Sequence, residues 1–154
     1  NAFEDGFTAI VQPVIVKNTD YFANVDMAYN SVAFEGDNVG KLTFYGSGAG
    51  KLPTANAVIS DCLDIAMKSY NVANPLGNKK LRNYNNKITG KFYLRVSDLN
   101  EDAQRSLRKI AKEVLNIGSV MALITDEIPL ATIKELISSL GIRKEKYFLG
   151  RIME

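Results

Sequence analysis

The stretch FYGSGAGKLPTA, residues 44–55, places three glycines within five positions, directly after an alternating run and directly before a helical pattern. Glycine loses more conformational freedom on folding than any other residue. Gly46, Gly48 and Gly50 are therefore expected where a bare backbone is needed. Two explanations for the bare backbone remain open. The peptide can lie against a bound ligand or against the next helix. Pro53 fits the first turn of that helix, where its missing amide proton costs nothing.

The sequence on both sides of this loop predicts a hairpin followed by a helix. Residues 27–46 alternate around EGDN, whose Gly36 and Asp37 suit a tight turn. After the loop, apolar residues recur at helical spacing, namely Ala55, Val58, Ile59, Cys62 and Ala66. Cys62 is therefore predicted to be a small core residue and not a nucleophile. Upstream, a β-rich run is interrupted by Pro13, which predicts an edge strand or two short pieces.

The second half of the chain has a different pattern. Residues 69–90 contain six Asn, one Pro and two Gly without a sustained period, and we assign 73–90 as a linker. Residues 91–98 alternate as a strand, and Asn100 can cap a helix that follows. That helix has the apolar stripe Ala103, Leu107, Ile110 and Val114. A single strand at 119–126, buried on both faces, then precedes a second helix.

The second helix begins near Pro129 and ends at Gly141, and a strand over 146–153 closes the chain. Its apolar stripe is Leu130, Ile133, Ile137 and Leu140. The order is therefore β-α-β-α-β, a small sandwich with helices on one face of a sheet. The whole chain is predicted to be α+β, with a partial antiparallel or mixed sheet and one long helix in its first part.

Composition limits the chemistry. The chain has 154 residues, of which 46% are hydrophobic and 23% are charged, as in a soluble globular protein of one or two small domains. No apolar run reaches the roughly 20 residues that span a bilayer. The first residues lack the features of a signal peptide. The absence of His and the single Cys exclude a disulfide within the chain and a zinc cluster, so we expect no metal and a cytoplasmic location.

Charge is divided unevenly along the chain. Residues 1–78 hold 4 basic and 8 acidic side chains, whereas residues 79–154 hold 15 and 9, a net charge of +6. Such an excess can indicate an anionic partner. However, these charges fall on the polar faces of amphipathic elements, with no basic stripe interleaved by aromatic residues. We therefore expect neither a nucleic acid nor a membrane as partner.

Residues 35–66, EGDNVGKLTFYGSGAGKLPTANAVISDCLDIA, resemble the end of the catalytic region of homoserine dehydrogenases. That family has an acidic-Gly-Asp-x-Val-Gly turn, a strand, and Gly-x-Gly-Ala-Gly-x-x-Pro-Thr-Ala leading into a helix. Residues 9–32 resemble the preceding strands of the family. The resemblance implies that residues 1–72 are the C-terminal part of the catalytic region of an enzyme that interconverts aspartate semialdehyde and homoserine with NAD or NADP, in threonine, methionine and isoleucine biosynthesis.

The resemblance also implies a role for the tail. In many bacterial homoserine dehydrogenases an ACT domain, a small regulatory sandwich that binds amino acids, follows the catalytic region. Residues 91–154 occupy that place and are ACT-like in pattern. They depart from it in two respects, because the sequence predicts one strand fewer than β-α-β-β-α-β and has SDLNEDAQ in place of the usual Asp-x-Pro-Gly.

Site residues follow from the same resemblance. It implies cofactor contacts from the loop and helix start, namely Gly46, Gly48, Ala49, Gly50 and Thr54. Bare amides can approach a flat ring closely, and a helix N-terminus favours a phosphate. For the glycines the alternative is close packing of strand and helix, and for Thr54 it is capping the helix. No catalytic residue is expected in this chain, because the family's catalytic lysine and Gly-x-Gly-x-x-Gly fold lie upstream.

Three functions remain open. The chain is part of an NAD(P)-dependent homoserine dehydrogenase and inactive alone, or an ACT-like sensor of an amino acid such as threonine, or a module for oligomer contacts only. Under the first of these functions, the cofactor would be NAD(P) in the full-length enzyme, and none is expected in the fragment. We also expect a homo-oligomer, because the hairpin and residues 9–16 would have unpaired strand edges and an uncovered apolar face.

Overall fold

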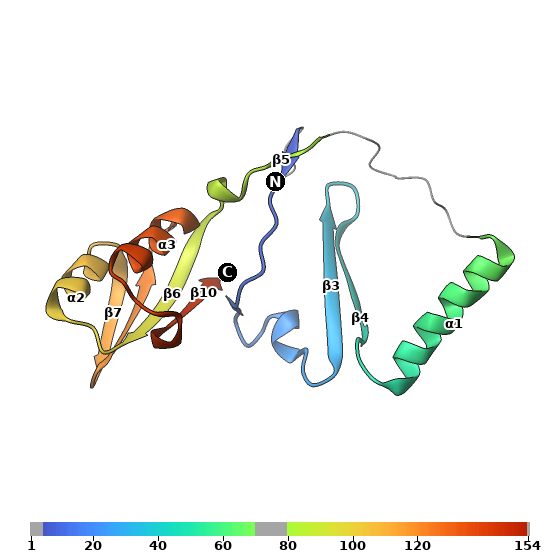
Figure 1. The fold of residues 1–154 in the computed structure, drawn as a ribbon, viewed down its shortest axis with the longest axis horizontal. Helices are drawn as coiled ribbons and strands as arrows, with labels where there is room; N and C mark the ends of the chain where they lie inside the picture. The colour runs from blue at the N-terminus through green and yellow to red at the C-terminus, as the bar shows by residue number, and fades with distance from the viewer. Residues whose placement is uncertain (1–4, 70–79, 154) are drawn as a thin grey trace. The chain divides into compact units, whose positions relative to one another are not determined.

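The chain forms two compact units in a computed structural model that describes residues 5–69 and 80–153. The sandwich unit consists of residues 1–16 and 80–154, and the hairpin unit consists of residues 17–79. Both combine helices with strands, in agreement with the predicted α+β class (Figure 1). The predicted linker lies outside the described residues over 73–79, and its last part, from residue 82, contains regular structure.

The sandwich unit is built on one mixed sheet. Its elements in chain order are β1 (Gly6–Phe7), β2 (Val14–Ile15), β5 (Arg82–Asn83), a 3-10 turn (Asn85–Lys87), β6 (Thr89–Ser97), α2 (Glu101–Arg108), β7 (Ala111–Ile117), β8 (Val120–Thr125), β9 (Ile128–Pro129), α3 (Leu130–Ser139), a 3-10 turn (Lys144–Lys146) and β10 (Tyr147–Ile152). The main sheet has the order β2-β10-β6-β8-β7, and β9 pairs with β6. Helices α2 and α3 lie on one face of this sheet (Figure 1).

The core of this unit lies between the sheet and the two helices. The alternation in β6 directs Phe92, Leu94 and Val96 to the helix side, where each is at most 1% exposed. Leu107 from α2 and Ile133 from α3 are fully buried against them. The predicted strand, helix stripe and core therefore agree with the structure at these positions.

The predicted strand count was wrong, because α2 is shorter than its pattern indicated. The helix ends at Arg108, and Val114, assigned to its stripe, lies in β7 opposite Leu123. Gly118 and Ser119 join β7 to β8 as a two-residue turn, with φ 58° at Gly118. The unit thus has the β-α-β-β-α-β order of ferredoxin-like folds, formed by β6, α2, β7, β8, α3 and β10. β8 is buried on one face and half-buried on the other.

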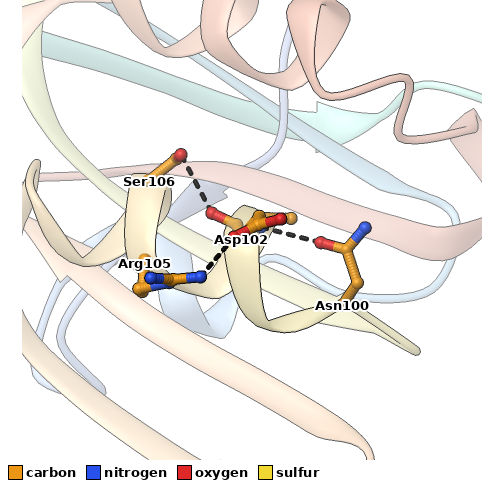
Figure 2. A network of polar contacts seen from close by, with 5 residues as sticks. Asn100, Asp102, Arg105 and Ser106 are labelled. Carbon is orange, nitrogen blue, oxygen red and sulfur yellow. Dashed lines mark hydrogen bonds and ion pairs between the residues drawn. The ribbon is translucent and has the colours of Figure 1, made fainter.

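The start of α2 is fixed by its own side chains (Figure 2). Asn100 is the N-cap, and its Oδ1 accepts a hydrogen bond from the amide of Ala103 at 2.8 Å, as predicted. Asp102 forms an ion pair with Arg105, and its carbonyl accepts a hydrogen bond from Ser106 Oγ at 3.0 Å. These contacts satisfy groups at the helix start within the helix itself.

The segment around Pro13 forms two short strands, as predicted. β1 pairs in parallel with β5, and β2 pairs in parallel with β10 at the edge of the main sheet. Residues 9–16 are therefore not left with two free edges, because Arg151 donates its amide to the carbonyl of Pro13 at 3.0 Å. One edge of β2 is covered by β10, which corrects the expectation of an unpaired segment.

The hairpin unit contains β3 (Tyr29–Gly36), β4 (Gly40–Ser47), α1 (Lys51–Met67) and a 3-10 turn (Tyr21–Asn24). β3 and β4 pair antiparallel from Tyr29 opposite Ser47 to Gly36 opposite Gly40, which confirms the predicted hairpin. Gly40 has φ 65° and closes a three-residue turn that begins at Asp37.

Helix α1 lies where the sequence pattern predicted a helix, but it lacks the predicted burial. None of its residues is buried, and Leu52 is 83% exposed. Cys62 is exposed, which corrects its assignment to a core. The apolar spacing correctly indicated a helix with one apolar face. Within the described residues, however, nothing covers that face.

Candidate functional site

The glycine loop connects β4 to α1. Gly46 is the penultimate residue of β4, Gly48 and Ala49 follow the strand, and Gly50 is the N-cap of α1. All four are exposed, as is Thr54 in the helix. The structure therefore brings the five predicted residues together on one short, accessible segment, and the reason for each glycine can be examined separately.

Gly50 is required by its backbone. It has φ 128° and ψ 160°, a conformation that is essentially restricted to glycine. Its carbonyl accepts a hydrogen bond from the amide of Thr54 at 3.1 Å, which begins the helical ladder. The glycine thus turns the chain from the strand into α1, independently of any ligand.

Gly48 packs closely against its neighbour on β3. A Cβ at Gly48 would overlap the side-chain amide of Asn30. The amide of Gly48 also donates to the carbonyl of Ala28 at 3.0 Å, so the loop continues the strand pairing for one more bond. Close packing within the hairpin therefore favours a glycine here, with the Asn30 side chain in this position.

Neither a positive φ nor close packing explains the glycine at position 46. It lies in β4 opposite Asn30, its φ is not positive, and a Cβ built on it would have no atom within 4 Å. A larger residue would therefore fit here without strain in the described residues. If glycine is needed at this position, the need comes from a group outside this part of the chain.

The first turn of α1 favours an anion. Gly50 provides no side-chain cap, and no acidic residue lies in the first turn. Lys51 is the first helical residue, so a positive charge adjoins the positive end of the helix dipole. Thr54 does not cap the helix, which excludes the predicted alternative, and its exposed hydroxyl is on the second turn.

The face of the β3–β4 hairpin that bears Tyr29 and Tyr45 carries an aromatic cluster. The rings of Tyr29 and Tyr45 stack at 5.0 Å, and Tyr21 meets Tyr45 edge to face at 6.4 Å. Desolvation raises the pKa of the Tyr45 hydroxyl, and Tyr29, Asp26 and Tyr21 raise it further. Tyr45 thus joins Tyr21 and Tyr29 in one aromatic cluster on the hairpin.

Asn30 is the residue that the sequence analysis missed. It occupies a position of the alternating apolar face of β3, with Val32 and Phe34 as the next residues on that face. A polar residue within an apolar alternation was the available signal. The structure shows that this side chain lies against Gly48 and directly opposite Gly46.

A hollow lies in the sandwich unit, where β6 leads into α2. It measures about 200 Å³ and is lined by Asp98, Asn100, Arg143 and Lys146, among others. Lys146 forms an ion pair with Asp98, and this contact is the main cause that lowers the pKa of the Asp98 carboxyl. Asp98 has φ 55°, so its backbone is in the left-handed region.

Two further observations concern other types of site. Within residues 5–69 and 80–153, no group of three His, Cys, Asp or Glu side chains is placed to hold a metal ion. In the same part of the chain, each helix is too short or too polar to cross a bilayer.

Comparison with known proteins identifies the first part of the chain. A sequence model of the family described as homoserine dehydrogenase matches residues 2–63. The homoserine dehydrogenase of Neisseria gonorrhoeae is 44% identical over 61 residues, which are 40% of this chain and 14% of that protein. The homoserine dehydrogenase of Helicobacter pylori is 47% identical over 58 residues, again 14% of its length.

Solved structures support the same relationship at the level of the fold. A homoserine dehydrogenase from Thiobacillus denitrificans matches 99% of this chain with a TM-score of 0.70 and 23% identity. The S. aureus homoserine dehydrogenase matches 90% of the chain with a TM-score of 0.53. The chain covers 40% and 36% of those two chains.

The geometry of the loop leaves room for a ligand. Gly46 leaves open space beside bare peptide, and the start of α1 favours a phosphate or another anion. The glycine loop, residues 46–50, lies within the range that the family model matches. Residues 2–63 are thus similar to the homoserine dehydrogenase family, and the matched segment spans 14% of the length of these two relatives.

Proposed function

We propose that the chain is the C-terminal portion of an NAD(P)-dependent homoserine dehydrogenase and that its glycine loop contacts the cofactor. The observation that carries this proposal is Gly46, whose missing side chain has no explanation within the described structure. It lies at the end of the strand that leads into the family motif. A ligand that approaches the bare peptide would explain the glycine.

In the proposed enzyme, a bound NAD(P) would supply the hydride chemistry that interconverts the alcohol of homoserine and the aldehyde of aspartate semialdehyde. Gly46, Gly48, Ala49 and Gly50 would hold the peptide surface against the cofactor, and Thr54 and Lys51 would offer a hydroxyl and a positive charge near it. These residues of the chain are proposed to bind and orient the cofactor, and proton transfer is assigned to groups in the rest of the complete enzyme.

The 154 residues alone are proposed to be inactive. They contain no Gly-x-Gly-x-x-Gly motif, and the family's catalytic lysine is expected upstream. The test compares the complete chain that carries this segment with the 154 residues alone, following reduced nicotinamide formation from homoserine. Turnover by the complete chain only is expected. Turnover by the 154 residues, or none by a folded complete chain, would contradict the proposal.

The sandwich unit is proposed to be ACT-like and regulatory or oligomerising. Its β-α-β-β-α-β order removes one of the two departures predicted from sequence. The hollow of about 200 Å³ beside Asp98 has room for a small ligand, and Arg143 supplies a positive charge. The carboxylate of Asp98, however, already forms an ion pair with Lys146.

Calorimetric titration of threonine separates these two roles of the sandwich unit. Heat that saturates at millimolar threonine and disappears in Arg143→Ala would support an amino-acid sensor. Arg95→Ala, on a strand residue that does not line this hollow, is the matched control and should retain the heat. The absence of heat in the wild type would favour a role in oligomer contacts only.

A further inference from the structure

One polar side chain interrupts the apolar face of the hairpin beside the glycine loop. Asn30 lies on the same face of β3 as Val32 and Phe34, directly opposite Gly46 of β4. It is exposed, and within the described residues its side-chain amide forms no hydrogen bond. The donors and acceptor of this exposed amide are therefore available to a polar ligand that approaches this face.

The position of this amide is set by the loop. The amide fills the space in which a Cβ at Gly48 would lie. The β3–β4 ladder holds the two strands together, and the hydrogen bond from the Gly48 amide to the Ala28 carbonyl at 3.0 Å holds the loop against β3. The side chain and the loop therefore share one corner, in which Gly46 leaves open space.

We infer that Asn30 is a cofactor-binding residue whose side-chain amide hydrogen-bonds to the carboxamide of the nicotinamide ring, an assignment that rests on the proposed function. A primary amide carries one acceptor oxygen and two donor hydrogens. Two primary amides can therefore pair, with an N–H of each donating to the oxygen of the other. The absence of a side chain at Gly46, directly across the strand pair, lets a flat ring approach the same corner.

Titration of the complete enzyme with its dinucleotide tests this assignment by binding alone. Asn30→Ala is expected to weaken the calorimetric Kd about tenfold, as the loss of one to two hydrogen bonds implies. Asn30→Leu keeps a side chain beside Gly48 without an amide and should weaken binding similarly. Asn38→Ala, in the turn at the far end of the same hairpin, is the matched control and should bind like the wild type.

An analogue of the cofactor makes the test specific for the carboxamide. The acetylpyridine dinucleotide has a methyl ketone in place of this amide and lacks its donor hydrogens. Wild-type enzyme should therefore bind the analogue more weakly than the natural cofactor, whereas Asn30→Ala should bind the two more equally. Because Asn30 is exposed, the melting temperature of the variants should match that of the wild type.

The outcomes separate two failures. If the wild type binds dinucleotide and Asn30→Leu binds it equally well, the amide has no role and the inference is overturned. An undiminished difference between cofactor and analogue in Asn30→Ala would also overturn it. If the folded wild type binds no dinucleotide, the proposed function itself fails, and Asn30 fails with it.

Discussion

The hydroxyl of Thr125 accepts a hydrogen bond from the amide of Phe92 at 3.0 Å, and both residues are 0% exposed. The bond extends the pairing of β6 and β8, whose ladder runs from Tyr93 opposite Ile124 to Ser97 opposite Val120. A side chain thus supplies the acceptor that this buried backbone amide needs at the end of the ladder.

Replacing Thr125 by Val should destabilise the sandwich unit by about 1–2 kcal/mol, because the buried amide of Phe92 loses its acceptor. Thr125→Ser keeps the hydroxyl and should recover part of the loss, although it removes a buried methyl group. Urea unfolding followed by circular dichroism gives both values. Equal stability of the Val variant and the wild type would show that the hydrogen bond contributes nothing.

The loop glycines should respond differently to the same substitution. Gly50→Ala forces a side chain into φ 128° and should destabilise the start of α1 by roughly 1–3 kcal/mol. Gly46→Ala meets no atom within 4 Å and should leave the melting temperature of the complete enzyme unchanged. However, it should weaken cofactor binding. A Gly46→Ala enzyme with normal cofactor affinity would remove the main support for the proposed contact.

Acid should weaken the link between Asp98 and Lys146. The hydrogen bond and charge of Lys146 lower the pKa of Asp98, so the stabilisation is present above the ordinary carboxylate range and is lost as pH falls through the lowered pKa. Asp98→Asn keeps a residue that tolerates φ 55° but removes the charge. The stability difference between wild type and variant should therefore shrink in acid. A difference that is constant with pH would exclude the ion pair as its cause.

The hairpin unit should promote self-association of the 154-residue chain through a second copy. Phe34 and Phe44 pack edge to face at 5.9 Å on the apolar face, and Phe44 is 62% exposed. Phe44→Glu should shift the mass measured by light scattering toward the monomer. Thr43→Glu, on the opposite face, is the control and should not. A wild-type monomer at high concentration would contradict the prediction.

Much of the fold followed from local patterns. The alternation of β6, the stripe of α3 and the turn before Gly40 depend on neighbouring residues, and the structure has them where the sequence indicated. The end of α2 was missed, because Val114 satisfies helical spacing from Leu107 although its partner is Leu123 on β8. The two-residue turn at Gly118 was the signal that favoured a hairpin here.

The site could be predicted only in part for a similar reason. The resemblance named the glycines, but spacing alone did not distinguish their causes. Gly48 depends on Asn30, which is 18 positions away in sequence and adjacent only after β3 and β4 pair. The exposure of Cys62 was equally hidden, because a helical pattern indicates an apolar face without showing what covers it.

The most direct test of the central claim is a crystal structure of the complete enzyme with its dinucleotide bound. We predict that the nicotinamide end of the cofactor lies in van der Waals contact with the peptide at Gly46, and that Gly48 and Gly50 border the same corner. A well-ordered cofactor that lies away from residues 46–50 would contradict it.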